Sequence, residues 1–315
     1  MTTPLQARPA GVTEPAPVLS AESATSRERA AGLGLMLAGS ASNQVGAAIG
    51  ALAFPVIGPV GVVAVRQLTM AAFLTPVVRP RLHRMTRAQW LPVLGLALSF
   101  SVMNLGLYAA VSRIGLGLAV TLEFLGPLCV AVLASRRAVD ACCALLAGVG
   151  VVVLTAPGPS TDYPGIALGL VAAGAWAAYI LLNRSVGQRL PGLQGTAAAG
   201  VVTAAAWTPV AVVWFWLHPP TVNALAFAVV CGLLASVVPY VADLLALRRV
   251  PTQLFSTLSS IHPLWAALAG WVVLGQVLGA NEWIGLGLIV IANVVVSARG
   301  VRAGREPRSG APGTS

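Results

Sequence analysis

Residues 115–135 read GLGLAVTLEFLGPLCVAVLAS, an apolar stretch whose only charged residue is Glu123. A helix needs roughly 20 apolar residues to cross the hydrocarbon core of a bilayer, and this stretch has that length. Gly126 and Pro127 follow Glu123 closely, and a proline inside a span frees backbone carbonyls that can line a wet cavity. The stretch therefore predicts a membrane-spanning helix that is disturbed next to an acidic side chain.

The rest of the chain repeats this pattern and predicts an all-α membrane protein. Of the 315 residues, 57% are hydrophobic and 9% are charged, whereas about a quarter of the residues of a soluble domain are charged. This composition excludes a soluble enzyme, a nucleic-acid-binding protein and a disordered scaffold. Ten spans are predicted, at residues 32–54, 58–78, 90–111, 115–135, 138–156, 164–183, 194–217, 224–246, 252–275 and 283–300.

The positions of the basic residues predict the orientation of these spans. The net charge is +10, lysine is absent, and most arginines lie between the apolar stretches. With a cytoplasmic N-terminus, every arginine except Arg66 and Arg113 falls on the cytoplasmic side, as the positive-inside rule requires. We therefore expect a multi-pass protein of the inner membrane whose tails, 1–30 and 301–315, are cytoplasmic and disordered.

A weak internal repeat divides the chain into two halves. Residues 112–128 realign with residues 248–264, and the spacing from Arg113 to Pro127 equals that from Arg249 to Pro263. The repeat predicts five spans in residues 31–156 and five in residues 157–300, and an odd number places the halves in opposite orientations. Such inverted repeats are typical of secondary transporters, which bind substrate near the midplane. Chance similarity between helices rich in leucine and alanine is the alternative.

Two charged residues inside the spans are candidate functional residues, because a charge in the bilayer needs a partner or a cavity. Glu123 could bind substrate or exchange protons, or it could be a hydrogen-bonding anchor between helices. Arg66 lies too deep in the second span to be a simple end anchor. It could pair with Glu123 or bind a substrate carboxylate through two hydrogen bonds, or it could extend to the interface.

Two further residues have comparable alternatives. Asp243 could face the substrate, or it could bridge to the arginines at 248–249. His262 precedes Pro263, and imidazole exchanges protons near neutral pH, although a lone histidine in a helix is more often structural. The remaining polar or aromatic candidates for the cavity or for helix contacts are Asn43, Gln44, Asn104, Tyr108, Trp176, Tyr179, Tyr240 and Trp265.

No motif for catalysis or for a cofactor accompanies these residues. The Walker A, HExxH and GxSxG patterns are absent, and the four cysteines lack metal-ligand spacing. We therefore predict neither enzyme activity, nor a cofactor, nor a metal.

Several stretches resemble drug/metabolite transporters of the EamA type, and among them the threonine/homoserine exporters of bacterial inner membranes. The resemblance covers nearly the whole chain, and residues 117–140 are its most specific part. The resembling stretches are 58–66, 104–108, 117–128, 135–140, 174–180 and 239–243. It implies two five-helix inverted repeats and export of a small amino acid or related metabolite, driven by an ion gradient. The chain departs from the family pattern at His262 and Gln276, where the family usually carries acidic residues.

The sequence thus predicts an alternating-access exporter of a small amino acid, with threonine or homoserine as the first candidates and protons as the coupling ion. Its predicted partners are this substrate and the lipid bilayer, without nucleic acid. Arg66, Asn104, Tyr108, Glu123, Trp176, Tyr179, Tyr240 and Asp243 are the predicted substrate-binding residues, with Glu123 and His262 for proton coupling. The alternatives are export of another amphipathic metabolite or drug, and a membrane enzyme or lipid-handling protein.

Overall fold

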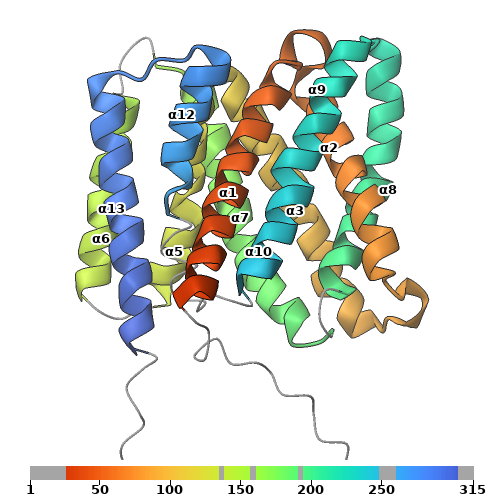
Figure 1. The fold of residues 1–315 in the computed structure, drawn as a ribbon, viewed down its shortest axis with the longest axis horizontal. Coiled ribbons are helices and arrows are strands. Elements are labelled where there is room, and N and C mark those ends of the chain that lie inside the picture. Colours follow the sequence, from red (N-terminus) through yellow and green to blue (C-terminus); the bar gives the residue numbers. More distant parts are fainter. Residues whose placement is uncertain (1–25, 135–137, 157–160, 191–193, 248–259, 304–315) are drawn as a thin grey trace, which may run out of the picture.

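The structure is a computed structural model that describes residues 26–134, 138–156, 161–190, 194–247 and 260–303. This part of the chain is a helical bundle without strands (Figure 1). Its α-helices are α1 (Ser26–Ala51), α2 (Phe54–Val78), α3 (Arg87–Ile114), α4 (Leu116–Glu123), α5 (Leu125–Leu133), α6 (Ala138–Thr155), α7 (Tyr163–Gly187), α8 (Gln194–Leu217), α9 (Val222–Gly232), α10 (Val238–Leu247), α12 (His262–Leu274) and α13 (Ala280–Ala303). A 3-10 turn, η2 (Leu82–Arg84), and a π-helical turn, η3 (Leu233–Val237), complete the described elements.

The bundle has two ends, which we call upper and lower as in Figure 1. At the upper end, α3 turns into α4 at Gly115, whose φ of 82° favours glycine. At the lower end, α2 leads to α3, and Thr86 caps α3 through a capping box with Gln89. The described chain begins and ends at the lower end (Figure 1).

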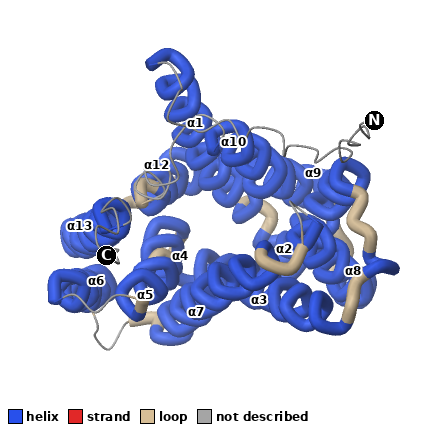
Figure 2. The backbone as a smooth tube through the Cα atoms, turned by 90° about the horizontal axis from the view of Figure 1, so that it is seen from below, coloured by secondary structure: helices blue, strands red, loops and turns tan. Residues whose placement is uncertain are grey.

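Neighbouring helices pack side by side through small and branched apolar residues. α3 packs along α7, α2 along α8 and α6 along α13, while α1 lies against α9, α10 and α12. Figure 2, which looks along the helices, shows α1 and α10 on one side of the interior and α3 and α7 on the other. The helices α2, α3, α7 and α8 are long and apolar enough to cross a membrane by themselves.

The described helices occupy the predicted apolar stretches, with four differences. The predicted span 224–246 is divided into α9 and α10 by the π-helical turn η3. The first part of the predicted span 252–275 lies outside the described residues. The predicted span 115–135 is divided into α4 and α5 at Phe124. α1 and α13 extend into the tails that we expected to be disordered, because α1 begins at Ser26 and α13 ends at Ala303. A helix can continue past the apolar stretch, since water satisfies its terminal backbone groups.

Two prolines explain the irregular backbone near the centre of the bundle. Proline has no N–H to donate to the carbonyl four residues earlier. Pro127 therefore leaves the Glu123 carbonyl without its helical bond, next to the break between α4 and α5. Pro239 has the same effect on the Ala235 carbonyl, which lies in the π-helical turn η3. π-helical turns occur frequently at functional sites.

Candidate functional site

A cavity of about 360 Å³ lies at the centre of the bundle, between α1, α2, α3, α4, α7 and α12. Its lining mixes apolar side chains with charged and polar ones. The lining residues are Met36, Ser40, Asn43, Gln44, Ala47, Arg66, Phe100, Met103, Asn104, Leu107, Glu123, Phe124, Trp176, Tyr179 and His262. A cavity of this size, with a few convergent polar groups, suits a small molecule.

The central cavity continues toward the lower end. A second cavity of about 300 Å³ shares Arg66, Asn104 and Tyr179 with the first and extends to Asn183 and Thr196. Asn183 lies in the last turns of α7 and Thr196 in the first turn of α8, and these helices meet at the lower end. A small polar molecule can therefore reach the central cavity from this side.

Arg66 is held in place by the π-helical turn. Its Nε donates to Ser236 Oγ at 2.9 Å, and its Nη2 donates to the Ala235 carbonyl at 2.9 Å. That carbonyl is the one that Pro239 leaves without its helical bond. The guanidinium carbon also lies 5.3 Å from the centre of the Tyr108 ring, within the range of a cation–π contact. These contacts use only part of the five guanidinium donors.

Glu123 is the last residue of α4 and faces the same cavity as Arg66. It is buried, and it interacts electrostatically with Arg66. The only ion pair within the described residues joins Arg113 and Asp162, so Arg66 and Glu123 do not contact each other directly. The cavity therefore presents a separate cation and anion.

His262 also lines the cavity, at the start of α12. Its Nε2 lies 3.0 Å from Ser40 Oγ, and its Nδ1 lies 3.2 Å from Gln44 Nε2. The imidazole also stacks on Phe124, with the ring centres 5.6 Å apart. Phe124 in turn meets Trp176 edge to face at 4.7 Å, so three rings form a continuous side of the cavity.

Known transporters resemble this chain over most of its length. Residues 163–298 match the EamA-like transporter family. The threonine/homoserine exporter RhtA of Escherichia coli (strain K12) is 34% identical over 269 residues, which cover 82% of this chain and 89% of that protein. The chain belongs to the EamA-like transporter family. It is thus a membrane transporter and not an enzyme.

Other relatives agree with this membership. RhtA of Salmonella typhimurium (strain LT2) is 33% identical to this transporter over 82% of the chain and 89% of the relative. The uncharacterized transporter YwfM of Bacillus subtilis (strain 168) is 28% identical over 44% of the chain and 46% of its own length. A protein of known crystal structure shares the fold, with a TM-score of 0.56 and 20% identity over 85% of this chain and 98% of that one.

The transporter's structure brings together most of the residues that the sequence singled out. Arg66, Asn104, Glu123, Trp176, Tyr179 and His262 line the central cavity. Tyr108 is buried behind Arg66, where its hydroxyl lies 3.0 Å from Cys231 Sγ, and it does not line the cavity. Tyr240 and Asp243 belong to α10, but their side chains lie outside the described part of the structure.

Two polar residues of the site were missed by the sequence analysis. Ser40 lies one helical turn before Gln44, so the spacing could have placed both on one face of α1. Ser236 offers no such signal, because its role depends on the π-helical turn that brings it to Arg66.

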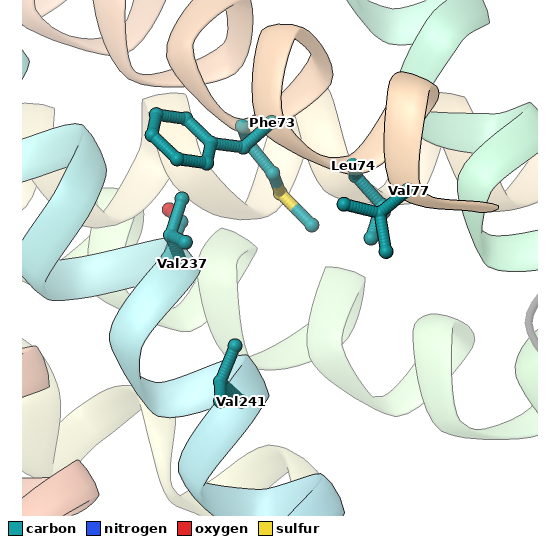
Figure 3. Close-up of a pocket in the computed structure, with 7 residues that line it drawn as sticks. Phe73, Leu74, Val77, Val237 and Val241 are labelled. Atoms are coloured by element: carbon teal, nitrogen blue, oxygen red, sulfur yellow. The ribbon is translucent and has the colours of Figure 1, made fainter. Parts of the chain in front are cut away.

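A separate apolar pocket of about 110 Å³ lies between α2 and α10 (Figure 3). Phe73, Leu74 and Val77 face Val237 and Val241 across it. It meets the lower cavity at Met70 and Ser236, which line both. Its lining has no charged side chain, so it cannot bind the charged groups of an amino acid.

The described side chains include no group of three or more histidine, cysteine, aspartate or glutamate residues that could hold a metal ion. The central cavity offers hydrogen bonds, separated charges and aromatic rings. These are means of binding a small polar molecule.

Proposed function

We propose that this transporter exports small amino acids, with threonine and homoserine as its first substrates. The observation that carries the proposal is the separated pair of charges, Arg66 and Glu123, in one central cavity. An amino acid is a zwitterion, so its carboxylate requires a cationic partner and its ammonium group an anionic one. The names of the RhtA relatives supply the choice of threonine and homoserine.

In this proposal Arg66 binds the substrate carboxylate with the donors that Ser236 and Ala235 leave available. Glu123 binds the ammonium group, beside the faces of Phe124 and Trp176, which also attract cations. The other proposed substrate-binding residues are Asn104, Trp176, Tyr179, Tyr240 and Asp243. Tyr108 does not touch the cavity and instead positions Arg66 from behind.

Transport would follow alternating access between two inverted repeats of five spans, residues 31–156 and 157–300. The packing of the described helices supports this division. In such a repeat α1 corresponds to α7, α3 to α9 and α10, and α4 with α5 to α12. α1 packs against α9, α10 and α12, while α7 packs against α3, α4 and α5, which are the corresponding partners. α2 with α8 and α6 with α13 are corresponding helices that pack against each other.

We further propose that the lower end faces the cytoplasm. Arg79, Arg81, Arg84 and Arg189 lie there, whereas Arg113 is at the upper end beside Asp162. The positive-inside rule then orients the bundle with both described ends of the chain on the cytoplasmic side. The cavity that extends to Asn183 and Thr196 would load substrate from the cytoplasm, as export requires.

Proton coupling would involve Glu123 or His262, the two cavity residues that can exchange a proton under physiological conditions. Glu123 is the stronger candidate, because no hydrogen bond to its carboxylate is found among the described residues. A proton and a substrate ammonium group could therefore compete for it.

Export of another amphipathic metabolite or drug is the second candidate. The apolar pocket in Figure 3 favours it, since this pocket meets the polar cavity at Met70 and Ser236. Such a substrate would place a polar head near Arg66 and an apolar tail between α2 and α10.

Counterflow in proteoliposomes tests the proposal. Vesicles are loaded with unlabelled threonine or homoserine, and entry of the labelled amino acid is followed with and without a pH gradient. We expect the wild type to accumulate the labelled amino acid. In Glu123→Gln the affinity for the amino acid should fall about 30-fold or more, because truncating a buried charged partner costs about 2–5 kcal/mol.

Glu282→Gln is the matched control, because Glu282 lies at the upper end, away from the cavity, and among the described residues its carboxylate accepts a hydrogen bond from the Gly279 backbone N–H. It should transport as the wild type does. Absence of flux in the folded, reconstituted wild type would contradict the amino-acid proposal and favour a screen of amphipathic compounds.

A further inference from the structure

Ser40, Gln44 and His262 form a hydrogen-bonded cluster on the wall of the cavity that carries no charge. Ser40 and Gln44 come from one face of α1, and His262 begins α12. Ser40 is 8% exposed and Gln44 is 4% exposed, yet all three residues line the central cavity. Ser40 and Gln44 are thus buried within the protein, His262 is half-buried, and all three face the cavity.

The hydrogen bonds of the cluster determine what it can offer to a ligand. Gln44 Nε2 is a donor, so His262 Nδ1 accepts and Nε2 carries the proton, which it donates to Ser40 Oγ. The Ser40 hydroxyl proton, the second Gln44 amide hydrogen and the Gln44 carbonyl oxygen then remain. None of them has another partner among the described residues. The opposite tautomer, with the Gln44 amide reversed, leaves both Gln44 amide hydrogens as donors and the Ser40 oxygen as an acceptor, so the cluster again offers donors beside an acceptor.

Donors beside an acceptor match a particular kind of ligand group. A hydroxyl or a primary amide both donates and accepts, so it can bond to the Ser40 hydroxyl and the Gln44 carbonyl together. A carboxylate offers no donor to the Gln44 carbonyl oxygen, and an ammonium group offers no acceptor to the Ser40 hydroxyl. An alkyl group would leave these buried groups unsatisfied, which is unfavourable.

We propose that Ser40, Gln44 and His262 bind the side chain of the substrate and select one that is uncharged and both donates and accepts hydrogen bonds. This inference rests on the proposed function, because it needs an amino acid whose charged groups face Arg66 and Glu123. His262 is then a binding residue whose two ring nitrogens are occupied, and Glu123 exchanges the proton. The other titratable residues that line the cavity with His262 are Arg66, Glu123 and Tyr179.

The decisive experiment compares threonine with valine, which has a methyl group in place of the threonine hydroxyl. Both compete against labelled threonine counterflow in proteoliposomes, together with homoserine, asparagine, aspartate and lysine. We expect the wild type to favour threonine over valine by at least about tenfold, because a site built for a hydroxyl rejects an analogue that lacks it. Homoserine and asparagine should compete, whereas aspartate and lysine should not.

Ser40→Ala removes the hydroxyl donor, and Gln44→Met removes the amide with its carbonyl acceptor at similar length. Each should lower the threonine-to-valine ratio by about fivefold, the effect of one hydrogen bond. Ser42→Ala is the control on the same helix, because Ser42 donates to the Leu234 carbonyl and does not line the cavity. It should leave the ratio unchanged, even if its rate differs.

The pH profile distinguishes binding by His262 from proton exchange. We expect His262→Asn, which keeps a donor and an acceptor, to retain the pH dependence of the wild type, and Glu123→Gln to lose it. A flat profile in His262→Asn would overturn the assignment of His262 as a binding residue.

Two further outcomes keep this proposal separate from the proposed function. Suppose that the wild type transports threonine and that Ser40→Ala and Gln44→Met keep its threonine-to-valine ratio. That result would overturn the selectivity proposal alone. A folded wild type that carries none of these amino acids would overturn the proposed function, and the selectivity proposal with it.

Discussion

The two walls of the central cavity satisfy their polar groups in different ways. On the wall formed by α1 and α12, Ser40, Gln44 and His262 bond to one another without a charge. On the wall formed by α2 and α4, Arg66 is bound from behind by Ser236 and Ala235, and it is separated from Glu123. Most polar groups of the first wall are therefore satisfied within that wall, whereas the second wall keeps opposite charges apart.

This difference indicates which wall depends on the ligand. A buried charge needs a partner or several hydrogen bonds, because removing it from water is unfavourable. Arg66 obtains two hydrogen bonds and the face of Tyr108, but Glu123 obtains no hydrogen bond among the described residues. A zwitterion between Arg66 and Glu123 would neutralise both. The charged wall should therefore dominate affinity, and the uncharged wall should adjust selectivity.

Of the substitutions in the two walls, replacement of Arg66 should have the largest effect on the affinity for threonine. Arg66→Gln removes the cation, so the concentration of threonine for half-maximal counterflow should rise about 30-fold or more. The affinity of the uncharged wall for a hydroxyl should be retained, so the threonine-to-valine ratio should stay near that of the wild type. Measurement of both quantities in proteoliposomes checks this. Equal losses of affinity and selectivity would mean that the two walls do not act separately.

Arg66→Lys separates the charge of Arg66 from its geometry. Lysine keeps the cation but lacks the planar fork that reaches Ser236 Oγ and the Ala235 carbonyl together. We expect an intermediate loss of affinity, about tenfold, in the same counterflow assay. Full activity of this variant would show that charge alone is sufficient at this position.

Ser236→Ala should have a smaller effect. The variant removes the acceptor of Arg66 Nε, while the Ala235 carbonyl still holds Nη2. The remaining bond to Ala235 keeps Arg66 near its place, so we expect the affinity for threonine to fall only about fivefold at an unchanged maximal rate. Thr208→Ala is the control, because the Thr208 hydroxyl donates to the Ala204 carbonyl of its own helix and the residue does not line the cavity.

The different chemistry of the walls explains what could be predicted from the sequence. Arg66 and Glu123 stand out because charges are rare in apolar spans. Pro127 predicted the break beside Glu123. Pro239 did not predict the π-helical turn that brings Ser236 to Arg66. That contact depends on how α2 packs against the turn, and such packing cannot be deduced from one helix alone.

The uncharged wall was harder to predict. A serine in a helix usually bonds to its own backbone, so the spacing from Gln44 was the one signal for Ser40, and its bond to His262 depends on how α12 packs. Tyr108 shows the opposite problem. It lies one turn after Asn104 on α3 and was expected in the cavity, yet it is buried behind Arg66 against Cys231. Residue type indicates what a side chain can bind, whereas helix packing decides which side chains reach the cavity.

The smallest expected effect lies outside both walls, at the upper end. Asp162 caps α7 by accepting from the Gly165 N–H at 2.7 Å, and it pairs with Arg113 at 3.0 Å. The Gly165 bond, followed by Arg113, lowers the pKa of Asp162 below its ordinary value of 3.8. A carboxyl whose pKa is lowered by folding stabilises the folded state above its unfolded pKa, and this stabilisation is lost as the pH falls through the folded value.

Asp162→Asn should therefore lower the unfolding temperature in detergent by about 1 °C at pH 7, since the pair is partly exposed and screened. The difference from the wild type should shrink as the pH falls below 3.8, where the wild-type carboxyl also becomes uncharged. Threonine affinity and the threonine-to-valine ratio should both stay unchanged, because neither wall of the cavity includes this residue. A change in either would mean that the contact at the upper end is coupled to the binding site, and that the two walls alone do not determine what the transporter binds.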